Sequence, residues 1–288
     1  MANRSRFIVA ESSIKALFKS AAQKVYNLAQ LNEILNEKRV LWNLPASMNG
    51  DKFLEKLLDS QILQKRDVYL QGLDQTKTRY VAVDASIYQI AVSLIGKSYL
   101  SHYTAVFVHG LTTQVPKVIY VSFEQSKKFQ NKGTLKQDAI DAAFMKPQRK
   151  SANVASYDDY TFIFHNGMYS NRAGVAAIDD IPVTNLERTL IDITVRPDYA
   201  GGVSSVLEAY RKAADKISIN KLIAILDKLD FTYPYHQSIG FYLQRAGIES
   251  SKLLPIRERK MNFDFYLTYQ MSEKEYDKGW RLYYPRGI

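Results

Sequence analysis

Apolar residues recur at helical spacing in three separate stretches near the N-terminus. Ser12 or Ser13 can serve as N-cap of the first helix, and Asn27 can serve as N-cap of the second. The pattern predicts helices over residues 14–21, 28–38 and 49–60. A short β-like stretch over 40–42 separates the second helix from the third.

Two β-like runs, 67–70 and 78–83, follow the third helix and flank a polar tip that contains Gly72. The order helix, helix, helix, hairpin is typical of a winged helix-turn-helix. In that architecture the third helix enters the major groove of DNA and the hairpin lies against the flanking backbone or minor groove. We therefore predict a DNA-binding domain over residues 1–84.

The rest of the chain alternates helical and strand patterns and predicts a larger mixed α+β domain over residues 85–288. Helices are expected over 87–95, 99–111, 186–195, 203–214, 219–229 and 236–246. Strands are expected over 117–121, 160–164, 175–178, 262–269 and 280–284, with a turn at 165–167. The predicted fold class is α+β.

The composition limits the cellular compartments in which we expect the protein. The chain has no cysteine, which excludes disulfides and thiolate metal sites. The apolar stretch at 7–10 is shorter than the roughly 7–15 residues of a signal peptide, and no apolar run approaches the roughly 20 residues that cross a bilayer. We therefore expect a cytoplasmic protein that does not interact with membranes.

The net charge of +10 is unevenly distributed along the chain. Residues 1–85 contain 13 Lys and Arg against 9 Asp and Glu, and residues 86–150 contain 9 against 3. Residues 151–288 contain 17 of each sign. A positive excess confined to the first half is the electrostatic pattern of a phosphate-binding surface, although a generally basic soluble protein remains an alternative.

The predicted third helix carries polar residues on one face that suit DNA. Asn49 is the candidate for reading a base, because an amide can bind adenine through two hydrogen bonds. Phosphate contacts are predicted for basic residues of the helix and the hairpin, namely Lys52, Lys56, Lys65, Arg66, Lys77 and Arg79. An acidic stripe, Asp51, Glu55 and Asp59, lies beside the lysines, so the lysines could instead solvate the helix and pair with it. A winged helix can also bind protein.

A second candidate basic surface lies in the connection after residue 124. It contains Lys127, Lys128, Lys132, Lys136, Lys146, Arg149 and Lys150. The alternative interpretation is a solvated loop with a short helix.

Several blocks in the second domain resemble AbiEi-type antitoxins of bacterial abortive-infection systems. The blocks are 99–105 (YLSHYTA), 109–111 (HGL), 116–121 (PKVIYV), 184–192 (TNLERTLID), Arg196-Pro197, Gly201-Gly202, 235–237 (YHQ), 240–243 (GFYL) and 245–247 (RAG). Their order and spacing carry the resemblance, which covers most of residues 12–288. The mixed charge of the third helix and the lysine-rich segment 127–150 depart from the family's pattern.

This resemblance implies a winged-helix domain that represses its own operon and a C-terminal domain that counters a nucleotidyltransferase-type toxin. In such systems, described as type IV, toxin and antitoxin act without a stable complex. The partners implied are double-stranded operator DNA, with inverted repeats read by two copies, and the cognate toxin. The candidate antitoxin-domain residues are Glu187, Arg188, Asp192, Arg196, His236, Gln237 and Arg245.

Other residues of the second domain suit different chemistry. Arg188 and Asp192 are four residues apart on a predicted helix and are expected to form an ion pair. A metal-dependent nuclease is an alternative, because Glu258-Arg259-Lys260 contains a Glu-x-Lys fragment, with Asp227 or Asp230 as upstream carboxylates. The scattered histidines have no zinc-site spacing, and His102 and His109 are expected to be packing residues. We expect no cofactor, no metal and no enzymatic activity; a protein-binding adaptor that docks the toxin directly remains a third possibility.

Overall fold

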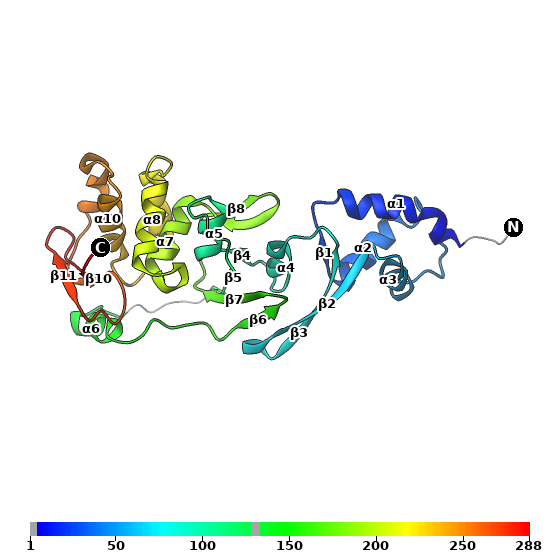
Figure 1. Ribbon diagram of the computed structural model, residues 1–288, viewed down its shortest axis with the longest axis horizontal. Coiled ribbons are helices and arrows are strands. Elements are labelled where there is room, and N and C mark those ends of the chain that lie inside the picture. Colours follow the sequence, from blue (N-terminus) through cyan, green and yellow to red (C-terminus); the bar gives the residue numbers. More distant parts are fainter. Residues whose placement is uncertain (1–4, 128–132) are drawn as a thin grey trace.

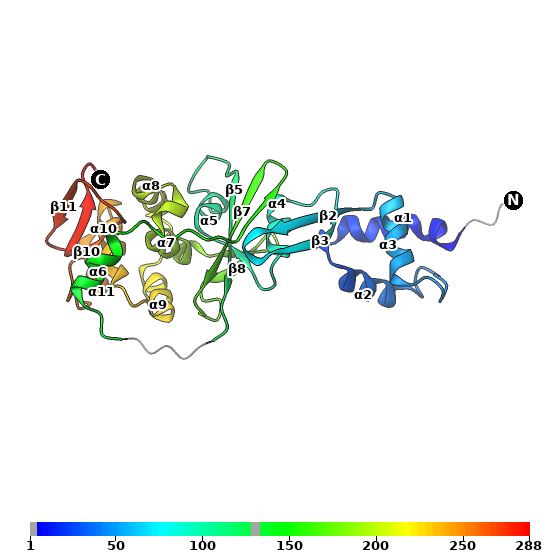
Figure 2. The ribbon, with the colours of Figure 1, turned by 90° about the horizontal axis from the view of Figure 1, so that it is seen from below.

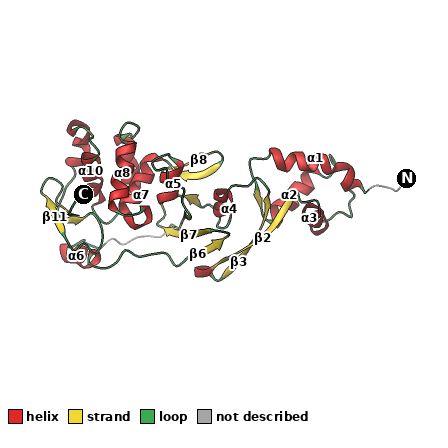
Figure 3. Cartoon of the chain, in the orientation of Figure 1, coloured by secondary structure: helices red, strands yellow, loops and turns green. Residues whose placement is uncertain are grey.

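The chain folds into an elongated α+β structure, seen here in a computed structural model that describes residues 5–127 and 133–288. Figure 1 shows three parts along the long axis. A helical part that contains the N-terminus lies at one end, a sheet lies in the middle, and a second helical part with a small sheet lies at the other end. Figure 3 shows that helices and strands alternate along most of this length. The predicted α+β class is confirmed.

The N-terminal part has the element order predicted for a winged helix-turn-helix. Its elements are α1 (Arg6–Ser20), β1 (Val25–Tyr26), α2 (Leu28–Lys38), α3 (Gly50–Asp59), β2 (Leu63–Leu70) and β3 (Gln75–Ala82). The strands form a three-stranded sheet in the order β1-β3-β2. One core, which includes Phe18, Trp42, Phe53 and Leu57, holds the three helices on this sheet.

The N-caps of the first three helices can be compared with the caps that the sequence predicted. Asn27 caps α2 through a capping box, as predicted. Asn49 caps α3, a role that was not predicted for it. The N-cap of α1 is Ser5, so the cap predicted at Ser12 or Ser13 is wrong. The reason is that the buried stripe of α1 begins at Phe7, so the amphipathic face extends well before these serines.

The predicted strand over 40–42 is instead part of the turn between α2 and α3. In this run only Trp42 is buried, stacked on Phe53 with 5.8 Å between ring centroids. The Arg39 guanidinium donates to the carbonyls of Pro45 and Met48 at 2.8 and 2.7 Å and so fixes the loop. Val40 and Leu41, which complete the apolar run, are exposed, so the run does not mark a strand.

The hairpin β2–β3 is the predicted wing, and one of its faces is covered. Val68 and Leu70 are buried in the same core as Val121 and Phe164 of the central sheet. At the hairpin tip, which contains η1 (Gln71–Leu73), a Cβ on Gly72 would lie 2.6 Å from the Ala152 carbonyl oxygen. The wing therefore packs across the boundary predicted at residue 84.

The central sheet has six strands in the order β6-β7-β5-β4-β9-β8. Its strands and its flanking helices are β4 (Tyr99–Leu100), β5 (Val118–Glu124), β6 (Val154–Tyr157), β7 (Tyr160–Gly167), β8 (Val175–Ile178), β9 (Ile181–Thr184), α4 (Ile87–Ser93) and α5 (His102–Val108). Two predictions are wrong: β7 runs through the expected turn at 165–167, and the helix expected over 99–111 begins with a strand. β7 continues because it pairs with β5 as far as Glu124 and Gly167.

The C-terminal part packs helices against a small sheet of order β10-β12-β11. Its elements are α6 (Gln137–Phe144), α7 (Leu186–Val195), η2 (Pro197–Ala200), α8 (Val203–Ala213), α9 (Ile219–Leu229), α10 (Tyr235–Arg245), η3 (Ser250–Leu253), α11 (Leu254–Arg257), β10 (Phe265–Tyr266), β11 (Lys274–Asp277) and β12 (Leu282–Pro285). Trp280 is fully buried against Gly240 of α10. The core here is the largest in the molecule.

Two separate segments of the chain contribute to the C-terminal part. After β5 it leaves the central sheet and forms α6, which lies beside the small sheet in both views (Figures 1 and 2). Gln137 of α6 exchanges hydrogen bonds with the backbone of Asp264, and Phe144 stacks on Tyr269 with 4.5 Å between centroids. The chain then returns to form β6.

Among the described residues, no helix is long and apolar enough to cross a membrane.

Candidate functional site

The first candidate site is the outer side of α3, where the structure gives Asn49 a role that the sequence did not predict. Its side-chain oxygen accepts a hydrogen bond from the Lys52 backbone N–H at 3.0 Å and caps the helix. A two-bond contact with adenine would need this same oxygen, so base reading by Asn49 competes with the cap. The base-reading role stays a prediction.

The lysines of α3 lie on a face of mixed charge. Lys52 is exposed, and its Nζ lies 3.4 Å from the Ser47 carbonyl oxygen. Lys56 is half-buried and pairs with Asp59 at 3.4 Å, while Asp51 and Glu55 are exposed beside it. The ion pair predicted as the alternative role of Lys56 is present, so Lys52 is the α3 lysine without a carboxylate partner among the described residues.

The basic residues of the wing divide into two kinds. Lys65 and Arg66 are exposed, with Lys65 paired to Asp67 at 3.1 Å and Arg66 bonded to Gln64 at 2.7 Å. Arg79 is directed into the protein instead, where Nε and Nη2 donate to the Ser93 carbonyl at 3.0 and 2.5 Å. Burial lowers the pKa of Arg79. The guanidinium ties the wing to α4, and the phosphate contact predicted for Arg79 stays a prediction that would compete with these bonds.

The second predicted basic surface is spread along the molecule. Lys136 and Lys146 flank α6, which lies at the opposite end of the structure from α3 (Figure 1). Arg149 and Lys150 precede β6, and Lys127 follows β5. Lys128 and Lys132 lie outside the described residues. The α6 lysines therefore cannot extend one continuous surface with α3.

The second candidate site is a cavity of about 290 Å³ at the carboxyl ends of the parallel strands β5 and β7. The cavity is also lined by α7, the starts of β4 and α5, the loop after β7 and the connection between α9 and α10. Pockets in open α/β sheets favour this position, because loops and helix ends converge beyond the carboxyl ends of parallel strands. The register places Ser122 of β5 beside His165 of β7.

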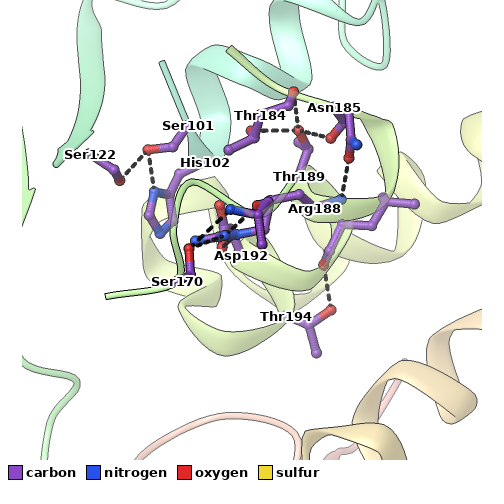
Figure 4. Close-up of polar contacts among 12 residues, drawn as sticks. Ser101, His102, Ser122, Ser170, Thr184, Asn185, Arg188, Thr189, Asp192 and Thr194 are labelled. Atoms are coloured by element: carbon purple, nitrogen blue, oxygen red, sulfur yellow. Dashed lines mark hydrogen bonds and ion pairs between the residues drawn. The ribbon is translucent and has the colours of Figure 1, made fainter. Parts of the chain in front are cut away.

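Arg188 and Asp192 of α7 lie in one wall as a buried pair (Figure 4). Arg188 Nε donates to Asp192 Oδ1 at 2.7 Å, and Nη1 donates to the Ala173 carbonyl at 2.7 Å. The second carboxylate oxygen of Asp192 is buried without a hydrogen-bond partner among the described residues. Burial raises the pKa of Asp192, and the neighbouring Arg188 opposes that shift. The predicted ion pair is confirmed, and it belongs to the cavity.

A carboxylate behind the cavity fixes the loop that carries Ser170. Glu124 accepts backbone hydrogen bonds from Ser170 and Arg172 at 3.0 and 3.1 Å, and its carboxylate also accepts the Ser170 hydroxyl. The Ser170 hydroxyl oxygen in turn accepts a longer bond of 3.4 Å from Arg188. These bonds hold the loop at a fixed distance from α7.

Two histidines form the opposite side of the cavity, with 5.5 Å between their ring centroids. His102 Nδ1 lies 2.8 Å from the Ser101 hydroxyl, which lies 2.7 Å from the Ser122 hydroxyl. Burial and the nearby charges lower the pKa of His102 well below its ordinary value and lower that of His165 to about 3. Both imidazoles are therefore neutral at pH 7. His102 also has a positive φ of 49°, a conformation that costs energy in a residue other than glycine.

The structure brings together three of the candidate antitoxin-domain residues and separates the rest. Arg188, Asp192 and Arg196 line the cavity. Glu187 points elsewhere, pairs with Lys221 at 2.8 Å and accepts the Ser218 N–H at 3.2 Å, which anchors the start of α9.

The other three candidates lie on α10. Gln237 is buried and donates to the Phe263, Trp280 and Arg281 carbonyls. Arg245 lies over the rings of Phe241 and Tyr284, at 5.0 and 5.4 Å from their centroids. His236 lines a separate cavity of about 120 Å³. Burial and the nearby Arg259 lower the pKa of His236 to about 4.

Sequence reasoning missed that His102, Ser122 and His165 belong to one site. The sequence pattern predicts a helix at His102 and a turn at His165, and neither prediction places a histidine at the end of a strand. The expectation that His109 is a packing residue fits its contact of 2.7 Å with the Thr184 carbonyl. A signal was available, since all three missed residues stand at or just after the ends of apolar runs.

The residues proposed for a nuclease do not assemble into a metal site. Arg259, which lies between Glu258 and Lys260, forms an ion pair with Asp227 at 2.5 Å. Asp227, one of the two suggested upstream metal ligands, is therefore already paired with a cation. Within residues 5–127 and 133–288, no group of three or more His, Asp and Glu side chains could hold a metal ion.

Comparison with known proteins gives a likeness of fold. No protein-family model and no curated protein matches the chain. Among solved structures, the chain is similar to the RV2827C protein from Mycobacterium tuberculosis, with a TM-score of 0.58 at 13% sequence identity. The likeness covers 98% of this chain and 93% of that chain. At this identity it shows that the two proteins share the fold along almost their whole length.

Proposed function

We propose that this protein is a cytoplasmic antitoxin that binds the operator DNA of its own toxin–antitoxin operon and represses it. The observation that carries the proposal is the position of α3. This second helix of the helix-turn-helix lies at one end of the elongated molecule, with its outer side exposed and the wing beside it (Figure 2). An exposed helix supported in this way is the element that enters the major groove in winged-helix proteins.

The phosphate contacts of this interface come from the residues that the fold leaves accessible. Lys52 of α3 and the wing residues Lys65, Arg66 and Lys77 are exposed or half-buried. Arg79 is the weakest of the predicted contacts, because its guanidinium is already bonded to the Ser93 carbonyl. Because Asp51 and Glu55 weaken the attraction of α3 for phosphate, the wing contributes most of the electrostatic binding energy. Two copies bind the two halves of an inverted repeat, since one module covers only a few base pairs.

The DNA-binding proposal is tested by measuring the affinity of the full chain for the duplex upstream of its own reading frame over a range of salt concentrations. We expect Lys52→Ala and Lys65→Ala each to reduce the slope of log K against log salt by about 1. Lys212→Ala is the matched control, because Lys212 is exposed on α8, far from α3. An affinity that does not depend on salt, or that neither N-terminal substitution changes, would refute the proposal.

In the second half of the proposal, the C-terminal part counters a nucleotidyltransferase-type toxin. Support comes from the resemblance of this part to AbiEi-type antitoxins and from the meeting of Arg188, Asp192 and Arg196 in one cavity. Co-expression with the nucleotidyltransferase encoded beside it should relieve growth arrest. We expect Arg196→Gln to reduce this relief and Lys52→Ala to retain it. Failure of the unaltered chain to relieve arrest would refute the antitoxin function, whereas co-purification at equal stoichiometry would assign direct docking of the toxin.

A further inference from the structure

One of the cations that line the cavity beyond β5 and β7 has no ion-pair partner among the described residues. Asp192 pairs with Arg188, the other cation in the wall. Arg196 donates to the Arg149 carbonyl at 2.9 Å and lies over the Tyr199 ring, but it forms no ion pair with any described residue. The two histidines are neutral at pH 7 and add no charge. An anionic ligand would compensate Arg196.

The cavity also contains a hydrogen-bond donor that has no acceptor among the described residues. Arg188 donates through Nε and Nη1, and its Nη2 has no acceptor among the described residues. Guanidinium groups present their N–H donors in a planar fork that matches the oxygens of a phosphate or carboxylate. Asn166 of β7 also lines the cavity. The free donors therefore suit a group with several oxygen acceptors.

The side contributed by the α9–α10 connection is aromatic. Phe231 and Tyr233 are half-buried and line the cavity together with Tyr235. The Phe231 and Tyr233 rings each pack edge-on against Tyr235, at 5.2 and 6.2 Å between centroids, which fixes their orientation. Aromatic walls favour a flat ring, because stacked and edge-on ring contacts are favourable beyond simple burial.

The volume of the cavity limits the size of the ligand that it can bind. About 290 Å³ is at the lower end of the range of roughly 300–1,000 Å³ for small-molecule sites, and it excludes a folded peptide or an oligonucleotide. We propose that the cavity binds one nucleoside monophosphate, with the phosphate facing the guanidinium groups of Arg188 and Arg196 and the base against Phe231 and Tyr233. The site lies outside the winged helix and does not depend on DNA binding.

The proposal is tested by isothermal titration of the full chain with AMP, GMP, CMP and UMP, and with inorganic phosphate and adenosine as partial ligands. We expect at least one of the four nucleotides to bind at least tenfold more tightly than either partial ligand. Arg196→Gln should weaken that nucleotide at least tenfold. The matched control is Arg211→Gln, because Arg211 is exposed on α8 and pairs with Glu208 outside the cavity. That control should leave the affinity unchanged.

A second variant separates loss of the site from loss of the fold. Phe231→Ala should weaken the nucleotide but leave the affinity for inorganic phosphate unchanged, with circular dichroism confirming that both variants are folded. The proposal is overturned if none of the four nucleotides binds, if inorganic phosphate binds as tightly as the nucleotides, or if a folded Arg196→Gln or Phe231→Ala protein binds like the unaltered chain.

Discussion

The burial of His165 makes the stability of this protein sensitive to acid, with a sign and size that follow from the structure. Its pKa is lowered to about 3, first because the ring is buried and then because Arg196 and Arg188 lie nearby. In an unfolded chain a histidine titrates near 6.5. Between these two values the unfolded chain holds a proton that the folded chain does not, so the unfolded state gains stability as the pH falls.

The contribution of His165 to stability is therefore complete above about pH 6.5 and is lost as the pH falls towards 3. The free energy of unfolding decreases by about 1.4 kcal/mol per pH unit in this window for one such histidine. At pH 4.5 the loss from His165 amounts to about 2 to 3 kcal/mol. His102, whose pKa is also lowered, adds to the acid sensitivity of the unaltered protein.

The perturbation that isolates this effect is His165→Gln, and the assay is urea unfolding at several values between pH 7 and pH 4.5. The substitution removes one titrating group, so the dependence of the unfolding free energy on pH should become shallower by about 1.4 kcal/mol per unit. Met168→Leu, in the same cavity wall, is the control and should keep the original slope. Equal slopes for His165→Gln and the unaltered chain would show that His165 is protonated in the folded protein, and the reasoning would be refuted.

Three further substitutions test individual contacts by thermal or urea unfolding, with DNA affinity added for the wing. Gly240→Ala should destabilise the protein by about 1–3 kcal/mol or more, because the new Cβ would lie 2.1 Å from Trp280, whereas Gly96→Ala, which meets nothing within 4 Å, should not. Arg79→Ala should cost about 1–3 kcal/mol by leaving the Ser93 carbonyl without its donor, whereas Lys77→Ala should spare stability and reduce the salt dependence of DNA binding. Asp192→Ala should cost about 3–5 kcal/mol, because Arg188 would remain buried without its counter-ion, and a loss under 1 kcal/mol would contradict a buried pair.

Local signals in the sequence predicted the helices well. The cap predicted at Asn27 is present in the structure. Ser218, which directly precedes the helix expected over 219–229 and was predicted to cap it, does so. For the helix expected over 186–195 the sequence favours Thr184 as N-cap, and this is wrong by one residue, because Asn185 accepts the Arg188 N–H and Thr184 ends β9. These interactions depend on residues three positions apart, so the sequence alone can specify them.

Short strands were predicted poorly, because their stability comes from partners far along the chain. β1 pairs with β3, and β4 pairs with both β5 and β9. Neither β1 nor β4 has enough residues to show an alternating pattern. β6 and β9 are edge or near-edge strands of four residues that escaped detection for the same reason. The strand Tyr99–Leu100 consequently looked like the start of the helix that follows it.

The cavity could not be predicted as one site, because its residues come from separate parts of the chain. Ser122 and His165 meet only because β5 and β7 are adjacent and parallel. Arg188 was identified through the family resemblance, and its pairing with Asp192 followed from helical spacing. The sequence therefore predicted the ion pair on α7, but the opposite wall depends on strand order, which local patterns do not contain.

The charge distribution along the sequence did not predict where the charges lie in the structure. The positive excess of residues 1–150 suggested one surface, but the fold directs these charges to different places. Arg79 is used inside the protein, Lys56 is paired with Asp59, and Lys136 and Lys146 flank a helix at the far end of the molecule. An excess of charge along a sequence predicts the sign of a partner's charge. The position of the contact depends on which cations the fold leaves unpaired, and for the proposed operator complex this favours Lys52 and the exposed residues of the wing.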